Sequence, residues 1–242
     1  MIDNDARRST GPWFVRAIQG LPTDLARIPP ALFPAEIVLE QMNPTVASVT
    51  EIHPAESALV AHAVDVRQRE FAAGRLCARR ALERLGIRAG PLLAEADRRP
   101  AWPADIAGSI SHTDGVCGVA VARRGVVIGI GFDAEPATAF PSDAWDTALT
   151  DAERRQLRDF PEPDRGIRAR LLFSAKEAFY KCYCSAGGGW LDFHDLEIRL
   201  TPTSDVLEVN ARKPLWERAR TVSGRYALTS RFIFTAFTMT TE

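Results

Sequence analysis

The chain has 242 residues, of which 46% are hydrophobic and 25% are charged, and its formal net charge is −1. This length allows one large domain or two small ones, with enough apolar residues for a substantial core. The near-neutral charge argues against a protein that binds nucleic acids or membrane surfaces in general. Both are negatively charged and bind proteins that carry an excess of basic residues.

The cysteines and the ends of the chain point to an ordinary intracellular protein. No C-x-x-C pair occurs among Cys77, Cys117, Cys182 and Cys184, which argues against a structural zinc site. Four cysteines in a chain of this length are also not typical of a disulfide scaffold. No signal peptide or membrane-spanning run is recognisable. We therefore expect a soluble cytoplasmic protein with reduced thiols.

The first part of the chain predicts an irregular lead followed by a strand and a long helix. Residues 1–35 are rich in proline, and residues 36–42 alternate as in a strand. Apolar residues recur at spacings of three, four and seven through residues 56–85, which predicts a helix. Gly74 is a candidate break in this helix, and Gly86 is a candidate C-cap.

The rest of the chain predicts strands, a capped short helix and a second long helix. Two β-rich runs, 116–122 and 126–132, flank Arg123-Arg124-Gly125, which suits a hairpin turn. A capping-box pattern at 150–153 opens a short helix. The remaining predictions are a helix over 165–185 ended by Gly187–Gly189, and further strands over 195–200, 206–209 and 226–237.

These elements predict an α+β fold with two halves of similar size. The halves are expected to meet near residues 123–130, so that residues 1–125 form the N-terminal half and residues 126–242 the C-terminal half. No literal sequence repeat relates them.

Two carboxylates stand at the end of a predicted strand. Asp133 and Glu135 are two residues apart, so on a strand their side chains point to the same face. Such a pair suits Mg²⁺, a hard cation that binds one or two carboxylates together with substrate phosphates. Taken alone, a solvated acidic turn before Pro136 is the commoner explanation.

A polar stripe runs along the second long helix. Arg170, Ser174, Glu177 and Lys181 follow one another at steps of four, three and four, which places them on one face. A surface ion pair between Glu177 and Lys181 would stabilise the helix by only ~0.3–0.5 kcal/mol. The apolar neighbours of Glu177 favour a partly desolvated carboxylate, suited to a metal ligand or a general base.

Candidate phosphate-binding groups lie upstream of the carboxylates. His112 ends the run Gly-Ser-Ile-Ser-His, whose small residues can cradle a phosphate, although a hydrogen-bonded loop histidine is commoner. The first long helix is strongly basic, and guanidinium groups bind phosphate oxygens in a fork. For most of its arginines, a solvated helix face is the expected role. These are Arg67, Arg69, Arg75, Arg79 and Arg80.

Five motifs in order make the chain resemble the 4′-phosphopantetheinyl transferases, of the type that includes enterobactin-synthase-associated enzymes and actinobacterial activators of carrier proteins. The resemblance spans roughly residues 36–200. The motifs are Gly-Arg-Leu-Cys-Ala-Arg-Arg-Ala-Leu (74–82), Arg-Pro-Ala-Trp-Pro (99–103), Gly-Ser-Ile-Ser-His (108–112), Gly-Phe-Asp-Ala-Glu-Pro (131–136) and Phe-Ser-Ala-Lys-Glu-Ala-Phe-Tyr-Lys (173–181).

The resemblance implies two pseudo-symmetric α/β halves with the active site between them. It further implies transfer of phosphopantetheine from coenzyme A to a serine of an apo acyl, aryl or peptidyl carrier domain, with release of 3′,5′-ADP. The resemblance also implies that the protein is a monomer. Mg²⁺ would be held by Asp133, Glu135 and Glu177. Glu177 would also be the base for the serine hydroxyl, directly or through water, and Lys181 would steady the pyrophosphate and protonate the leaving group.

The resemblance also implies a set of coenzyme A contacts. Ser111 and His112 would contact its phosphates, and His112 joins Glu177 and Lys181 as a catalytic residue. Three arginines would grip the 3′-phosphate and the adenine end: Arg67, Arg75 and Arg99. Lys176 is a further candidate for binding coenzyme A.

Three features depart from the family pattern or match none of it. Phe132 replaces a usual aliphatic residue, and Cys182-Tyr-Cys184 with the triple glycine is unusual in the region where a carrier is expected to dock. Residues 1–35 match no motif. Two other functions remain open: a Mg²⁺-dependent phosphohydrolase using the same carboxylates, and a non-catalytic relative that binds coenzyme A or carrier proteins.

Overall fold

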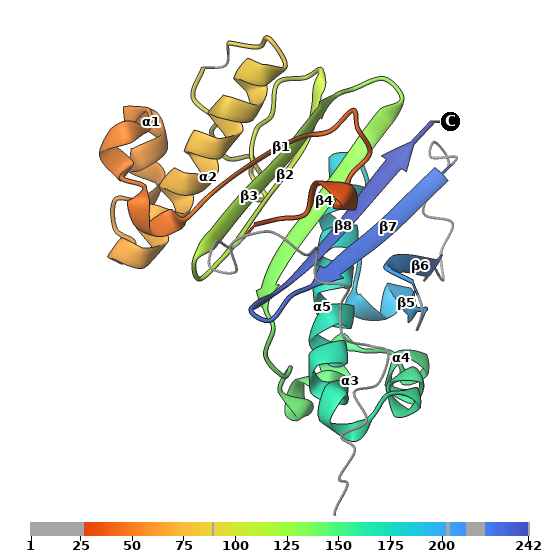
Figure 1. Cartoon of the computed structure of the whole chain (residues 1–242). Helices are drawn as coiled ribbons and strands as arrows, with labels where there is room; N and C mark the ends of the chain where they lie inside the picture. The colour runs from red at the N-terminus through yellow and green to blue at the C-terminus, as the bar shows by residue number, and fades with distance from the viewer. Residues whose placement is uncertain (1–26, 89, 202–203, 212–220, 242) are drawn as a thin grey trace, which may run out of the picture.

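The protein folds as two antiparallel sheets, each with a long helix packed against it (Figure 1). The computed structural model describes residues 27–88, 90–201, 204–211 and 221–241, so most of the proline-rich lead lies outside the described residues. Helices and antiparallel sheets together confirm the predicted α+β class. In the described ranges, no helix has the length and apolar character needed to cross a membrane.

The first sheet has three strands in the order β1-β3-β2. Helix α2 packs against β1 and β3 through a face of small residues that includes Ala72, Ala73, Cys77, Ala78 and Ala81. A short helix, α1, precedes it. The bounds are β1 Val38–Met42, α1 Pro54–Ser57, α2 Asp65–Arg84, β2 Ile106–Thr113 and β3 Val116–Arg123.

Helix α2 continues unbroken through Gly74, so the candidate break is wrong. A Cβ atom at Gly74 would lie 3.1 Å from Cγ2 of Ile110, which shows that the missing side chain lets the helix approach β2 closely. The helix ends where predicted. Gly86 has a φ of 74°, and the amide of Ile87 donates to the carbonyl of Leu82 at 2.9 Å.

The second sheet has five strands in the order β4-β8-β7-β6-β5. The capping box at Thr150 and Glu153 is confirmed. The run predicted as a strand over 226–237 is instead two strands, β7 and β8, joined by a turn. The bounds are β4 Val127–Pro136, α3 Trp145–Ala148, α4 Asp151–Gln156, α5 Glu162–Ser185, β5 Leu196–Leu200, β6 Val206–Ala211, β7 Thr221–Leu228 and β8 Phe232–Thr240.

The predicted hairpin between β3 and β4 is wrong, because the two strands belong to different sheets. Strand β4 pairs with β8 on one side and lies beside β2 on the other, as Figure 1 shows. The amides of Phe132 and Ala134 donate to the hydroxyls of Ser109 and Ser111, at 3.0 and 3.2 Å. Two serine hydroxyls thus replace ladder hydrogen bonds and join the two sheets.

Helix α5 lies directly on β4 and β8. Glycine makes this close approach to β4 possible: a Cβ atom at Gly131 would overlap the carbonyl oxygen of Ala178. The polar stripe of α5 therefore faces the end of β4, where Asp133 and Glu135 stand.

Candidate active site

Asp133 lies at the centre of a buried hydrogen-bonded group. The residue is 5% exposed, and each carboxylate oxygen accepts a hydrogen bond from a serine hydroxyl: Ser111 donates to Oδ1 at 2.9 Å and Ser174 to Oδ2 at 2.8 Å. Nζ of Lys181 lies 2.6 Å from Oδ1. The lysine also donates to the Ser111 hydroxyl and to the carbonyl of Phe132, both at 3.3 Å. One residue from each of β2 and β4 and two from α5 meet here.

Glu135 and Glu177 lie close enough to Asp133 for its negative charge to affect their pKa values. Burial raises the pKa of both glutamates, and the negative charge of Asp133 raises both further. Glu135 is paired with Arg170, whose Nη1 lies 3.0 Å from its Oε2. Glu177 makes no hydrogen bond or ion pair within the described residues. The structure therefore brings the three predicted carboxylates into one electrostatic group.

The donor chemistry of this group suits a hard divalent cation. Carboxylate oxygens are the preferred ligands of Mg²⁺, and the mutual repulsion of three carboxylates is relieved by a cation between them. In the part of the chain that the structure describes, however, no three His, Cys, Asp or Glu side chains are arranged so as to hold a metal ion. Asp133 and Glu135 are instead neutralised by Lys181 and Arg170.

A basic group lies on the neighbouring face of α2. Nη1 of Arg67 is 2.6 Å from Nε2 of His112, and Arg75 stacks over the ring of Phe71 at 4.2 Å. Arg75 is only 6% exposed, and this burial lowers its pKa. Among the described residues, Nε of Arg75 and Nδ1 of His112 are buried atoms without a hydrogen-bond partner. The unpaired Nε of Arg75 marks a place where a ligand can supply an acceptor.

His112 links the basic group to the acidic one. Burial lowers its pKa, Glu70 raises it, Arg67 and Lys181 lower it, and Asp133 raises it. Charged side chains on α2, α5 and β4 therefore all influence the pKa of this histidine. A ligand with two separated phosphate groups would find cationic side chains at both ends of this region.

Two predicted residues lie apart from the rest of the site. Nζ of Lys176 is buried against Glu153 at 2.6 Å and also donates to two carbonyls, those of Ala148 and Phe193. The side chain is 1% exposed, so the predicted contact of Lys176 with coenzyme A is corrected to a structural ion pair in the C-terminal half.

Arg99 does not join Arg67 and Arg75. It pairs with Asp97 at 2.6 Å and donates to the carbonyl of Cys184 at 2.7 Å, near the end of α5. The guanidinium thus adds a second donor to this carbonyl, which also accepts the amide of Gly187, and places a positive charge at the C-terminus of the helix. The contact of Arg99 with coenzyme A stays a prediction.

Residue patterns did not single out two groups that the structure brings to the site. Glu70 lies one turn after Arg67 and contacts both Arg67 and His112, at 3.5 and 3.4 Å. The only indication in the sequence is that Glu70 follows Arg67 by three residues, a spacing that places both side chains on the same face of a helix. The pairing of Arg170 with Glu135 was not predicted either, although Arg170 belongs to the polar stripe.

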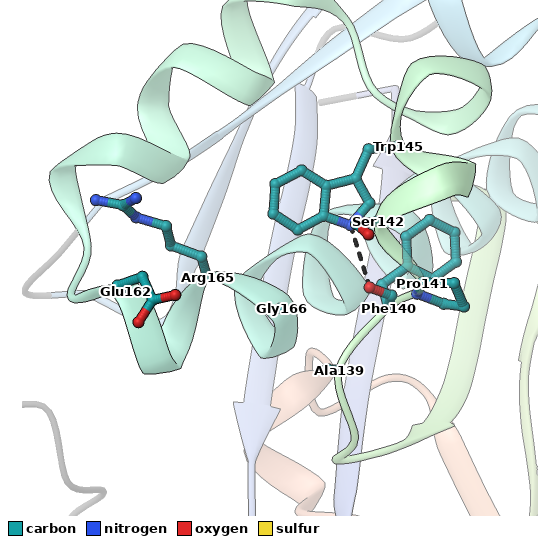
Figure 2. A pocket seen from close by; sticks show the side chains of 8 residues that line it. All are labelled: Ala139, Phe140, Pro141, Ser142, Trp145, Glu162, Arg165 and Gly166. Carbon is teal, nitrogen blue, oxygen red and sulfur yellow. Dashed lines mark hydrogen bonds between the residues drawn. The ribbon is translucent and has the colours of Figure 1, made fainter.

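A surface hollow of about 520 Å³ lies beyond the end of β4, between the turn before α3 and the start of α5 (Figure 2). The indole of Trp145 donates to the carbonyl of Phe140 there, at 3.1 Å. None of the predicted site residues lines this hollow. Its lining residues are Ala139, Phe140, Pro141, Ser142, Trp145, Glu162, Arg165 and Gly166.

Two family models match the chain, and their ranges include both parts of the site. A family model described as the 4′-phosphopantetheinyl transferase N-terminal domain matches residues 55–122, and the model of the 4′-phosphopantetheinyl transferase superfamily matches residues 129–229. The chain belongs to the 4′-phosphopantetheinyl transferase superfamily. The first match contains the basic group of α2 with His112, and the second contains the carboxylates and Lys181.

Relatives named as 4′-phosphopantetheinyl transferases match more than half of the chain. The 4′-phosphopantetheinyl transferase Svp of Streptomyces mobaraensis is 39% identical over 155 residues, 64% of this chain and 63% of Svp. The 4′-phosphopantetheinyl transferase PptT of Mycobacterium tuberculosis is 38% identical over 146 residues, 60% of this chain and 63% of PptT. The chain thus matches somewhat less than two thirds of the length of each of these relatives.

Solved structures of the superfamily are more distant. A holo-(acyl-carrier-protein) synthase from Bacillus anthracis, solved in complex with coenzyme A (3′,5′-ADP), aligns with a TM-score of 0.40 and 18% identity. The alignment covers 49% of this chain and 100% of that one. A likeness at this level supports no further argument about the site.

Proposed function

We propose that this protein transfers the 4′-phosphopantetheine group of coenzyme A to a serine of an apo acyl, aryl or peptidyl carrier domain and releases 3′,5′-ADP. Superfamily membership supports the reaction class. The observation that carries the proposal is the joining, through His112, of a buried acidic group to a basic group with unpaired nitrogens. Coenzyme A carries a pyrophosphate and a separate 3′-phosphate, which suit the two groups.

In this proposal the 3′-phosphate binds at the basic end. Arg67 and Arg75 carry guanidinium groups, which bind phosphate through two parallel hydrogen bonds. The Nε–H group of Arg75 has no hydrogen-bond partner among the described residues and is free to donate to the phosphate. The pyrophosphate lies between Ser111 and Lys181, next to the ring of His112. Binding energy from the remote 3′-phosphate then helps to hold the reacting phosphorus in place.

Asp133, Glu135 and Glu177 would hold Mg²⁺, which requires Lys181 and Arg170 to give up part of their contact with the carboxylates. The ion would reduce the negative charge that the nucleophile meets. Lys181, 29% exposed, faces the leaving pyrophosphate oxygen as a donor.

The transfer forms one bond and breaks one. The carrier serine oxygen attacks the phosphorus attached to pantetheine, and the bond from that phosphorus to the bridging oxygen of the pyrophosphate breaks. Glu177 takes the serine proton, directly or through water, because it is the carboxylate of the three without an ion pair in the described residues. Its raised pKa makes it a stronger base than an exposed glutamate.

Intact mass of an apo carrier protein tests the proposal. Incubation with this protein, coenzyme A and Mg²⁺ is expected to add one phosphopantetheine, and EDTA or replacement of the carrier serine is expected to abolish the gain. Loss of coenzyme A without any carrier would instead indicate a phosphohydrolase. Tight coenzyme A binding with no modification of several carrier types would indicate a non-catalytic relative.

We further propose that the protein acts as a cytoplasmic monomer. All four cysteines are free and buried, which agrees with a reducing compartment. Sedimentation at several protein concentrations tests the oligomeric state, and a concentration-dependent dimer would contradict it.

A further inference from the structure

The contact between Arg67 and His112 defines the state of the imidazole. Nη1 of Arg67 and Nε2 of His112 are 2.6 Å apart, and a guanidinium has only donors to offer. Nε2 must therefore be the acceptor, and the ring must be neutral with its proton on Nδ1. Burial of the ring also favours the neutral form.

Glu70 is the group that faces this Nδ1 proton. Its Oε2 lies 3.4 Å from Nδ1 of His112 and 3.5 Å from Nη1 of Arg67, and its side chain is 20% exposed. Nδ1 is buried and has no aligned hydrogen bond among the described residues, so the nearby carboxylate is its available acceptor. A carboxylate behind an imidazole is a common way to select one tautomer.

We infer that Glu70 is a positioning residue: it holds His112 in the Nδ1–H form, so that Nε2 receives Arg67 and directs the guanidinium toward a phosphate. The inference rests on the proposed function for the identity of its ligand, coenzyme A. Arg67 is 51% exposed and needs such an anchor, because a free arginine side chain loses considerable rotamer entropy when it binds.

A positioning role and a purely electrostatic role predict opposite results. Removal of a negative charge beside a phosphate site should tighten anion binding if charge alone matters. Removal of the anchor should weaken it. Glu70→Met deletes both charge and acceptor, whereas Glu70→Gln deletes the charge and keeps an oxygen for the Nδ1 proton. Glu83→Met, at an exposed position of the same helix, is the matched control.

Calorimetry with coenzyme A and with dephospho-coenzyme A, which lacks the 3′-phosphate, measures the effect. The preference of the wild-type protein for coenzyme A should fall about 10-fold in Glu70→Met, as expected for one charge-assisted contact. Glu70→Gln should retain most of the preference, and Glu83→Met all of it. An unchanged or increased preference in Glu70→Met would overturn the inference.

A second measurement needs no coenzyme A. The ¹⁵N shifts of the His112 ring in the ligand-free wild-type protein at pH 7.5 should report the Nδ1–H tautomer, and Glu70→Met should lose it. The Nε2–H tautomer or an imidazolium in the wild-type protein would overturn the inference. If the wild-type protein failed to bind coenzyme A, the proposed function would fail, and this spectrum would still decide the role of Glu70.

Discussion

Glu177 differs from the other two carboxylates of the site. It is half-buried near Asp133, and among the described residues no cationic side chain forms an ion pair with it. This state suits a base better than a structural residue. Glu177→Gln should lower kcat for carrier modification by about 10²–10⁴-fold, the usual range for loss of general base catalysis. Coenzyme A binding, measured by calorimetry, should stay within a few-fold. Turnover like that of the wild-type protein would remove Glu177 from the mechanism.

Arg75 combines burial with an unpaired Nε, which makes it the strongest candidate for a 3′-phosphate contact. Arg75→Ala should weaken coenzyme A binding by about 10–100-fold, the range for a charge-assisted hydrogen bond, and should leave dephospho-coenzyme A nearly unaffected. Arg80→Ala, at an exposed position of the same helix, is the control. Equal losses for both ligands in Arg75→Ala would argue against the contact.

At the scale of elements, Lys176 and Glu153 connect α5 to α4 and β5. Glu153 accepts the amides of Thr150 and Ile198 besides the lysine. Burial raises the pKa of Glu153 and lowers that of Lys176, and their mutual attraction opposes both shifts. The pair is therefore costly to bury and more costly to break.

Lys176→Met leaves the Glu153 carboxylate buried without its cation. The free energy of unfolding, measured by urea denaturation, should fall by about 3–5 kcal/mol. The double variant Lys176→Met/Glu153→Gln should recover part of this loss, because the amide still accepts from the backbone and carries no charge. No recovery would show that the lysine acts through packing alone.

The contact of α5 with β4 depends on Gly131. Gly131→Ala places a methyl group against the carbonyl of Ala178 and should separate the helix from the strand, at a cost of about 1–3 kcal/mol in the free energy of unfolding. Carrier modification should fall as well, because Glu177 would move relative to Asp133. Gly125→Ala adds its methyl group to open space and is the control. Equal effects of the two variants would contradict this account.

For the whole molecule, the contact between the two sheets includes hydrogen bonds as well as apolar packing. Ser109→Ala removes the acceptor of the Phe132 amide and should cost about 1–3 kcal/mol in the free energy of unfolding. Because both sheets share this join, circular dichroism and tryptophan fluorescence should show one transition with the same midpoint. Ser142→Ala, at an exposed position, should change little. Separate transitions would show that the two halves unfold independently.

Periodicity placed several candidate site residues on shared faces. The period-2 geometry of a strand places Asp133 and Glu135 on one face, and the 3.6-residue period of a helix aligns Arg170, Ser174, Glu177 and Lys181. These are local relations, which depend on neighbouring residues, and the structure brings both sets together. The capping box before α4 and the end of α2 at Gly86 were predictable for the same reason.

The tertiary structure alone decided which partners these faces meet. Lys176 and Glu177 are adjacent in sequence but about 100° apart around α5, so one meets Glu153 in the core and the other faces β4. Strand β4 pairs with β8, roughly a hundred residues away, rather than with the neighbouring β3, and residue patterns carry little information on such distant pairing. The sequence by itself thus determined the candidate groups and their local faces, whereas long-range packing decided which of them lie together.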